Sequence, residues 1–305
     1  MVALKLKVKM TISSNGSRPN HDLERWCTVE GNTFRYLTTG SGAPIVLLHG
    51  LLGFSFSWRR NLARLAHLGT LYAIDALGAG YSDHPCPLEC GMSAQAERVL
   101  KLMDALGIGS ATLVGNSHGG AISMKVAALS AERGRPRVNR LLLVDPVHPW
   151  AEYEWQQKLL IDCPPALTLF GPALLHSKLL QILFLRRLYG DPRLVTPGTI
   201  EGYTKALRQA GTLQYGTGVV RSWRKDLSDL DRLSAHLAKI PAAVVWGTED
   251  HAVKVESAPR LCQVFEDCEF IPMPGVGHMP MEEAPEQFNA IATRFLGGGC
   301  RDGHC

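Results

Sequence analysis

The sequence has no apolar run of the about 18 residues that a membrane span needs. Its densest apolar stretch, residues 179–185, ends at Arg186 and Arg187. Residues 4–10 alternate apolar side chains with lysines, and residues 1–10 lack the continuous apolar segment of a secretory signal. A large excess of one charge is also missing, because 32 basic and 28 acidic residues leave a net charge of +4. We therefore expect no membrane span and no nucleic-acid partner.

Cysteine is scarce, with eight residues in a chain of 305. Neither Cys86/Cys90 nor Cys300/Cys305 has a second pair at the distance typical of a zinc site, so we expect no metal ion. The even count would suit a disulfide framework, but no secretory signal accompanies it. We therefore expect reduced thiols and a cytoplasmic location.

The composition excludes a mainly disordered chain, because 46% of the residues are hydrophobic and 20% are charged. A chain of this length corresponds to one large domain, or to one domain with a sizeable addition. It can bury enough surface to fold without a metal or disulfide staple. No internal repeat is visible.

Short apolar segments alternate with helical patterns from residue 25 onward. Apolar strands separated by crossover helices indicate an α/β fold with a mostly parallel eight-stranded sheet flanked by helices. The first two strands, joined by Glu30-Gly31-Asn32, predict an antiparallel hairpin at one edge. The predicted strands are 25–29, 33–38, 45–49, 71–75, 112–116, 141–145, 243–247 and 270–272, and the predicted helices include 93–106, 121–131 and 258–265.

Two further segments lie outside this alternation. Residues 4–10 have the period-two pattern of an edge strand, and residues 13–20 read as a flexible linker. Residues 148–225 show helical stretches broken by prolines and no strand pattern. Such an insertion is most simply a helical cap over the carboxyl ends of the strands, where open α/β sheets bind ligands. The predicted layout is an N-terminal extension (1–24), a core (25–147 and 226–297), a cap (148–225) and a flexible tail (298–305).

The strongest motif is Gly115-x-Ser117-x-Gly119, which lies between a predicted strand and a predicted helix. A serine on such a sharp turn has a strained backbone and an exposed hydroxyl, and the flanking glycines give the turn room to form. The positive end of the following helix then faces the oxyanion that forms during acyl transfer.

Partners for this serine follow later in the chain. Glu249 and Asp250 lie in a polar turn after the predicted strand 243–247, and His278 lies in a glycine-rich loop after strand 270–272. Both segments follow strands, so their side chains can meet Ser117 at one edge of the sheet. A base that contacts the nucleophile and an acid that orients the base are the requirements of nucleophilic catalysis.

The sequence resembles the α/β-hydrolases in these three segments and in their order. Two further segments match the family: residues 48–51 (Leu-His-Gly-Leu) and 75–83 (Asp-Ala-Leu-Gly-Ala-Gly-Tyr-Ser-Asp). The similarity covers about residues 25–297. It implies the α/β-hydrolase fold with an inserted helical cap and no cofactor. It is much more specific for the fold than for the substrate.

The resemblance also implies a role for each residue. Ser117 is the expected nucleophile, His278 the general base and then acid, and Asp250 the residue that orients His278. The backbone N–H groups of Leu51 and His118 are the expected oxyanion donors. The family pattern Trp-Gly-x-x-Asp favours Asp250 over Glu249 as the acid. Asp145, Glu282 and Glu283 are expected to be structural, although some family members carry their acid at the position of Asp145.

A serine nucleophile argues against the haloalkane dehalogenases and epoxide hydrolases of this fold, which use an aspartate there. We therefore expect a serine hydrolase, carboxylesterase-like, that acts on a small or medium hydrophobic ester, as a monomer or homodimer. Asn116, Trp150 and Met279 are candidate pocket residues. A carbon–carbon bond hydrolase of the meta-cleavage type is the alternative: its Gly-Asn-Ser-x-Gly-Gly motif is present, but Met279 stands where those enzymes commonly have tryptophan. A non-catalytic ligand receptor of this fold is a third hypothesis.

Overall fold

A computed structural model describes residues 21–151 and 177–298. The predicted edge strand 4–10 and linker 13–20 lie outside these residues, as does nearly all of the predicted tail. One eight-stranded sheet runs through the molecule in the order β1-β2-β4-β3-β5-β6-β7-β8. All eight predicted strands are present: β1 (Glu24–Val29), β2 (Asn32–Thr39), β3 (Pro44–Leu48), β4 (Thr70–Ile74), β5 (Ala111–Asn116), β6 (Val138–Val144), β7 (Ala242–Gly247) and β8 (Cys268–Met273).

The pairing of the strands follows the sequence pattern. β1 pairs antiparallel with β2, and β2 antiparallel with β4, whereas all other neighbours are parallel. The edge hairpin turns at Glu30 and Gly31, whose φ angles of 50° and 82° are both positive. Two successive positive φ angles are the requirement of a tight hairpin turn that matches the twist of the strands.

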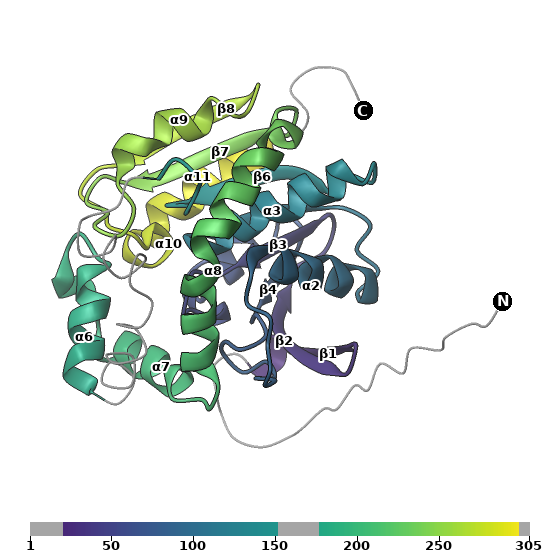
Figure 1. Cartoon of the computed structure of the whole chain (residues 1–305). Coiled ribbons are helices and arrows are strands. Elements are labelled where there is room, and N and C mark those ends of the chain that lie inside the picture. The colour runs from purple at the N-terminus through teal and green to yellow at the C-terminus, as the bar shows by residue number, and fades with distance from the viewer. Residues whose placement is uncertain (1–20, 152–176, 299–305) are drawn as a thin grey trace.

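Helices cover both faces of the sheet (Figure 1). Alternate strand residues, such as Val46 and Leu47, enter two separate core clusters, which explains why the strands read as continuous apolar runs. α2, α3, α9 and the end of α8 pack on one face, and η2, α1 and α11 pack on the other. The bounds are η1 (His21–Leu23), η2 (Ser55–Trp58), α1 (Leu62–Leu65), α2 (Met92–Ala105), α3 (His118–Glu132), η5 (Val255–Ser257), α9 (Ala258–Cys262), α10 (Pro280–Glu283) and α11 (Pro285–Gly297).

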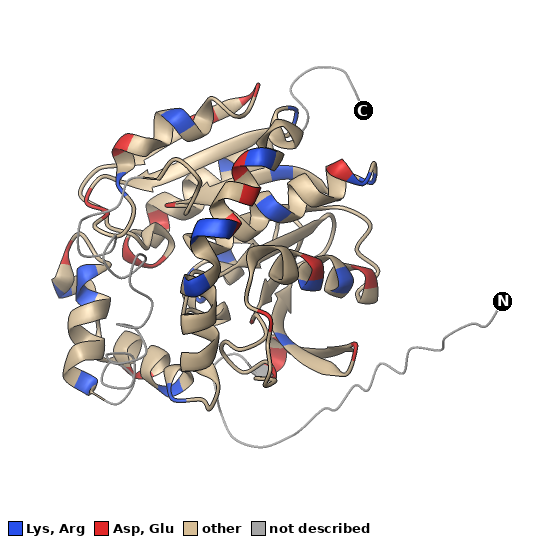
Figure 2. Cartoon of the chain, in the orientation of Figure 1, with Lys and Arg blue, Asp and Glu red and all other residues tan. Residues whose placement is uncertain are grey.

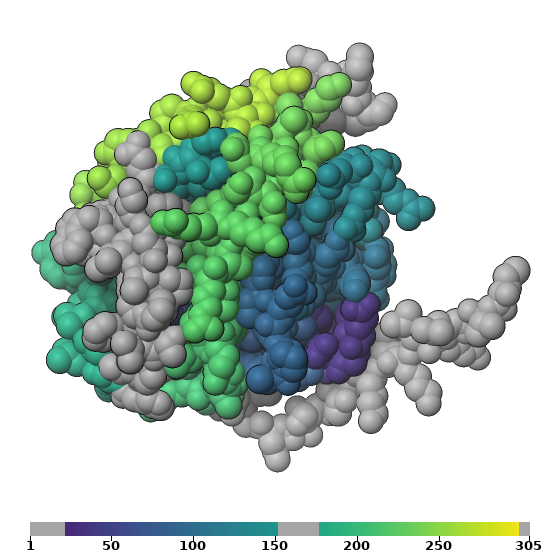
Figure 3. All heavy atoms as spheres, viewed as in Figure 1, coloured from purple at the N-terminus to yellow at the C-terminus, as the bar shows by residue number. Residues whose placement is uncertain are grey.

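Between β6 and β7, the described residues from Lys178 to Leu237 form helices and the short connections between them. This region contains α6 (Lys178–Arg187), η3 (Pro192–Leu194), α7 (Pro197–Leu207), α8 (Thr212–Leu233) and η4 (Ser234–Leu237). α8 is continuous through the predicted domain boundary at residues 225 and 226, and its atoms form a strip along the front of the molecule beside those of α2 and α3 (Figure 3). α8 therefore joins the helical insertion to the core without a break.

Lys and Arg are interspersed among Asp and Glu along the helices in view (Figure 2). Within residues 21–151 and 177–298, every helix falls short of the length and apolar character that a membrane crossing requires.

The expectation of reduced thiols was wrong for one pair of cysteines. Cys262 and Cys268 form a disulfide that joins the end of α9 to the first residue of β8. The short connection between these elements brings the two cysteines together, which a count of cysteines could not reveal. Cys27, Cys86 and Cys90 are free thiols, and the three remaining cysteines lie outside the described residues.

Candidate active site

Ser117 lies on the sharp turn between β5 and α3. Its φ of 54° and ψ of −120° are unusual for a residue other than glycine, and its side chain is half-buried. Close packing requires the flanking glycines, because a Cβ on Gly115 would lie 2.3 Å from the Gly119 oxygen, and one on Gly119 would lie 2.3 Å from the Leu48 oxygen. The glycines thus let the turn approach β3, and the turn exposes the serine hydroxyl.

Two backbone N–H groups near Ser117 are available to an incoming oxyanion. His118 is the first residue of α3, and within the described residues neither its N–H nor that of Leu51 donates a hydrogen bond. The loop that carries Leu51 passes directly beside the serine, because a Cβ on Gly50 would lie 3.1 Å from the Ser117 Cβ. His49 braces this loop: its Nδ1 lies 2.8 Å from the Gly50 oxygen, and its Nε2 accepts the Ala76 N–H at 3.1 Å.

His278 and Asp250 are buried and follow the parallel strands β8 and β7, so they form a pair at the same edge of the sheet. Their Nδ1 and Oδ2 atoms are 2.7 Å apart. The other Asp250 oxygen accepts the N–H groups of Ala252 and Val253 at 2.6 and 3.0 Å, which fixes the carboxylate. The His278 Nε2 atom therefore remains for a proton exchanged with a nucleophile. No hydrogen bond joins His278 to Ser117 in this structure, and such contacts often tighten only with substrate.

Asn116 connects the turn at Ser117 to the loop of the histidine. Its side-chain amide donates to the backbone oxygens of Val144 and His278, both at 3.1 Å. The side chain is buried, and both donor hydrogens are used inside the protein. This bond is the direct link between the segment of Ser117 and that of His278.

Other candidates lie at different places. Glu249 is exposed, whereas Asp145 is fully buried and lies beside Asp250. Trp150 packs against the His148 ring at 6.0 Å and under the Arg260 guanidinium at 5.8 Å. Met279 is buried at the start of α10.

The side chain of His118 points away from the serine and toward α8. Its Nδ1 accepts the Trp223 indole N–H at 3.2 Å, and its Nε2 lies 3.3 Å from the Gln95 Oε1 atom, which also accepts the Tyr215 hydroxyl. Burial, with a smaller effect of the charge on His49, lowers the pKa of His118 to about 3. The ring is therefore neutral at physiological pH. It lines a small cavity of about 30 Å³.

The sequence did not predict that the two glutamates after His278 contact residues far away in the chain. The Glu283 carboxylate accepts the N–H groups of Gly277, Gly190 and Asp191 at 2.7, 3.0 and 2.8 Å. The His278 N–H donates to the Leu188 oxygen at 2.7 Å. The loop of the histidine is thus bonded to the segment that follows α6. The bond to Gly277 fits the structural role expected of Glu283, but the contacts with a segment about 90 residues away had no signal in the sequence.

Glu282 is equally buried and joins the same two regions. Its carboxylate pairs with Arg59 at 2.6 Å and accepts the hydroxyl groups of Tyr189 and Tyr203. Burial raises the pKa of this carboxyl, while Arg59 and the hydrogen bonds act in the opposite direction.

Among the described residues, one cluster has the ligand types of a metal site: Asp145, Asp250 and His278. The short contact between His278 Nδ1 and Asp250 Oδ2 is a hydrogen bond, so these two atoms already satisfy each other. The donor set therefore fits a histidine–acid pair better than a metal ion.

The comparisons with known proteins show the family of the chain. Residues 45–291 match the model of the alpha/beta hydrolase family. The chain is 31% identical, over 88% of its length and 68% of the relative, to the dihydrolipoyllysine-residue acetyltransferase component of the acetoin cleaving system of Pseudomonas putida. It is 27% identical to haloalkane dehalogenase 2 of Mycobacterium tuberculosis, over 89% of its length and 94% of the relative. It is 26% identical to the 2-hydroxy-6-oxo-6-(2'-aminophenyl)hexa-2,4-dienoic acid hydrolase of Metapseudomonas resinovorans, over 90% of its length and 91% of the relative.

Solved structures show the same fold. Cfl2 of Burkholderia cenocepacia superposes with a TM-score of 0.79 at 22% identity, over 90% of this chain and 95% of that one. The meta-cleavage product hydrolase CumD of Pseudomonas fluorescens IP01 gives a TM-score of 0.72 at 21% identity, over 91% of this chain and 99% of that one.

Proposed function

The chain belongs to the alpha/beta hydrolase family, and we propose that it is a serine hydrolase, carboxylesterase-like, cleaving a small or medium hydrophobic ester. The observation that carries this proposal is the position of Ser117. It occupies the strained turn and is linked through Asn116 to the loop of His278. It also lies beside two backbone N–H groups that donate no hydrogen bond to any residue within 21–151 and 177–298. The dehalogenase among the relatives belongs to a class whose nucleophile is an aspartate, which forms its ester intermediate on a carboxylate. A serine instead favours acyl transfer.

The proposed reaction proceeds through an acyl-enzyme. The Ser117 Oγ atom attacks the ester carbonyl, and His278 Nε2 accepts the hydroxyl proton. The N–H groups of Leu51 and His118 stabilise the oxyanion, where one donor typically contributes about 2.7–4 kcal/mol to the transition state. The imidazolium then gives its proton to the leaving alcohol, and Asp250 stabilises its charge. Water, activated by the same histidine, releases the acid.

The test is the hydrolysis of p-nitrophenyl butyrate by the Ser117→Ala variant. We expect a loss of about 10³-fold or more in kcat, with an unchanged far-UV circular dichroism spectrum. Ser110→Ala, at a partly exposed serine that contacts Asn139, is the matched control and keeps its activity. Activity of Ser117→Ala within tenfold of the parent protein would overturn the assignment.

A carbon–carbon bond hydrolase of the meta-cleavage type is the second candidate. It is supported by the relative of Metapseudomonas resinovorans and by Asn116 before the serine. A panel of p-nitrophenyl esters of increasing acyl length, run beside a meta-cleavage dienoate, separates the two activities. Tight retention of a ligand with very slow turnover would instead favour a receptor.

We propose that Trp150 and Met279 contribute to the substrate pocket together with Asn116. Trp150→Ala and Met279→Ala should change the preferred acyl length of the ester. They should not abolish hydrolysis, as Ser117→Ala does. We keep a monomer or homodimer and a cytoplasmic location as proposals, to be tested by light scattering and by fractionation of cells.

A further inference from the structure

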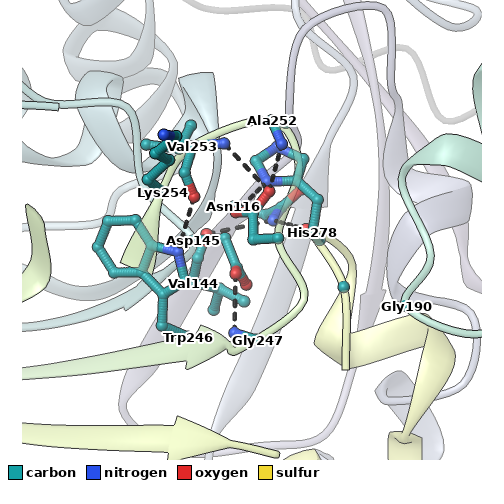
Figure 4. A network of polar contacts seen from close by, with 12 residues as sticks. Asn116, Val144, Asp145, Gly190, Trp246, Gly247, Ala252, Val253, Lys254 and His278 are labelled. Atoms are coloured by element: carbon teal, nitrogen blue, oxygen red, sulfur yellow. Dashed lines mark hydrogen bonds and ion pairs between the residues drawn. The ribbon is translucent and has the colours of Figure 1, made fainter. Parts of the chain in front are cut away.

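A second acid lies behind the histidine–acid pair. Asp145 follows β6 and has a positive φ of 45°, a strained conformation for a residue with a side chain. Its side chain is fully buried, and its Oδ1 atom accepts the Gly247 N–H at 2.9 Å (Figure 4). Its Oδ2 atom is also buried and has no hydrogen-bond partner among the described residues. One carboxylate oxygen of Asp145 lies within 4.8 Å of ligand atoms of both Asp250 and His278.

Two carboxylates this close together in a dry site do not both ionise. The protein offers different numbers of N–H donors to the two carboxylates. Asp250 faces three N–H donors, from Ala252, Val253 and the His278 ring, whereas Asp145 faces the single N–H of Gly247. The anion is therefore better stabilised on Asp250, and the proton belongs on Asp145.

The other charged groups around Asp145 favour the same distribution. Glu283 adds a further negative charge that opposes ionisation of Asp145, and the Nε2 atom of His148 lies 3.1 Å from the Ser257 hydroxyl. Burial and then the charge of Asp250 hold the pKa of Asp145 well above its usual range, against the opposing hydrogen bond from Gly247. His278 is the nearby base, and its Nδ1 is already bonded to Asp250.

We propose that Asp145 is a positioning residue that carries a proton at neutral pH, so that Asp250 is the one anion of this pair of acids and the carboxylate bonded to the His278 ring. This inference rests on the proposed serine-hydrolase function. With one anion, the imidazolium is stabilised enough to form but can still give its proton to the leaving group. With two anions it would hold that proton too strongly. The Asp145 carboxyl, within 4.8 Å of the Asp250 carboxylate, also helps to hold it in place.

The first test does not depend on turnover. In protein labelled with ¹³C at the aspartate carboxyls, NMR spectra recorded from pH 5 to pH 8 should show one aspartate that remains protonated at pH 7. That signal should be absent from Asp145→Asn and present in Asp231→Asn, a matched change at an exposed aspartate. If every aspartate of the unmodified protein is ionised at pH 7, the proposal is wrong, whatever the variants do.

The second test is kinetic. Asparagine copies the neutral acid, because it keeps an acceptor for the Gly247 N–H and a donor toward Asp250. Asp145→Asn should retain kcat within about threefold, and its acidic limb in the pH profile of kcat/KM should move by less than about 0.3 unit. Asp145→Ala should lose between about tenfold and a hundredfold in kcat with little change in KM, as expected when a supporting group is removed.

The outcomes separate this proposal from the proposed function. If Asp145 were ionised, Asp145→Asn would remove a negative charge near His278 and shift the acidic limb downward by about 1–3 units, which would overturn the inference. A wild-type kcat in Asp145→Ala would also overturn its positioning role. If Ser117→Ala kept its activity, the serine-hydrolase assignment would be refuted. The NMR experiment would still decide whether Asp145 carries a proton, because it does not depend on turnover.

Discussion

Gly190 and Gly277 share one acceptor, because both of their backbone N–H groups donate to the Oε2 atom of Glu283, at 3.0 and 2.7 Å. One glycine follows α6 in the helical insertion, and the other precedes His278. The two backbones are in contact, since a Cβ on Gly277 would lie 2.4 Å from the Gly190 nitrogen. The position of His278 thus depends directly on a segment of the insertion.

Gly277→Ala is therefore expected to lower both stability and turnover. The added methyl group would meet backbone atoms of Leu188 and Gly190, which cannot rotate away as a side chain could. Overpacking of this kind costs about 1–3 kcal/mol, and we expect kcat to fall at least tenfold as His278 is displaced. Urea unfolding and ester hydrolysis measure the two effects. Gly109→Ala is the control, because nothing lies within 4 Å of its added Cβ; equal losses in both variants would refute the explanation.

The buried ion pair of Glu282 and Arg59 makes a second prediction. Removing one partner of such a pair leaves an uncompensated buried charge, which costs about 3–5 kcal/mol. We expect this loss for Glu282→Ala, which also leaves the hydroxyl groups of Tyr189 and Tyr203 without their acceptor. Lys101→Ala breaks the exposed pair with Glu30 and should cost less than about 1 kcal/mol. Chemical denaturation of both variants measures the difference, and a loss below 1 kcal/mol in Glu282→Ala would contradict the prediction.

Buried histidines make the fold sensitive to acid. Burial lowers the pKa of both His118 and His148 to about 3, whereas an unfolded histidine titrates near 6.5. Below about pH 6.5 the unfolded chain therefore binds more protons than the folded chain, and the free energy of unfolding falls as the pH is lowered toward 3. Each such histidine contributes about 1.4 kcal/mol per pH unit in this window.

His148→Gln tests this linkage. Between pH 7 and pH 5 the variant should lose about 2 kcal/mol less unfolding free energy than the parent protein, because glutamine does not titrate. His236→Gln, at an exposed position, should follow the parent curve. Parallel curves for the parent protein and His148→Gln in urea titrations would show that His148 is not buried in its neutral form.

The sequence predicted the elements whose information is local. The central strands β3 to β7 are short and mainly apolar segments between turn residues, and the turn at Ser117 is encoded by the glycines on both sides of it. The turn with Asp250 and the loop with His278 were recognisable because each follows a strand. The parallel sheet then brings these carboxyl ends to one edge, so contacts between distant residues such as the His278–Asp250 bond followed from the topology.

The features that escaped prediction depend on tertiary contacts alone. Nothing near Glu283 in the sequence indicates that it will bind Gly190, because that contact requires the insertion to fold back over the loop of the histidine. Asp145 ends a strand like many aspartates, and only its positive φ and its burial beside Asp250 distinguish it. The disulfide of Cys262 likewise depends on the short connection to β8.

The contact between His118 and Trp223 gives a final prediction, about how α8 supports the oxyanion donor. Because Nδ1 of the neutral His118 ring accepts the indole N–H, its proton lies on Nε2 and is donated to the Gln95 oxygen. Trp223→Phe removes the donor and leaves a buried Nδ1 atom without its partner, which should cost about 1–3 kcal/mol of stability.

The same change should loosen the first turn of α3, whose His118 N–H is a proposed oxyanion donor, and should lower kcat more than it raises KM. Trp26→Phe, at a tryptophan that is 45% exposed on β1, is the control. ¹⁵N NMR of labelled histidine should show the Nε2–H tautomer of His118 in the parent protein and in Trp26→Phe. A His118 ring protonated on Nδ1 in the parent protein would contradict this arrangement, because that nitrogen could then accept no hydrogen bond from Trp223.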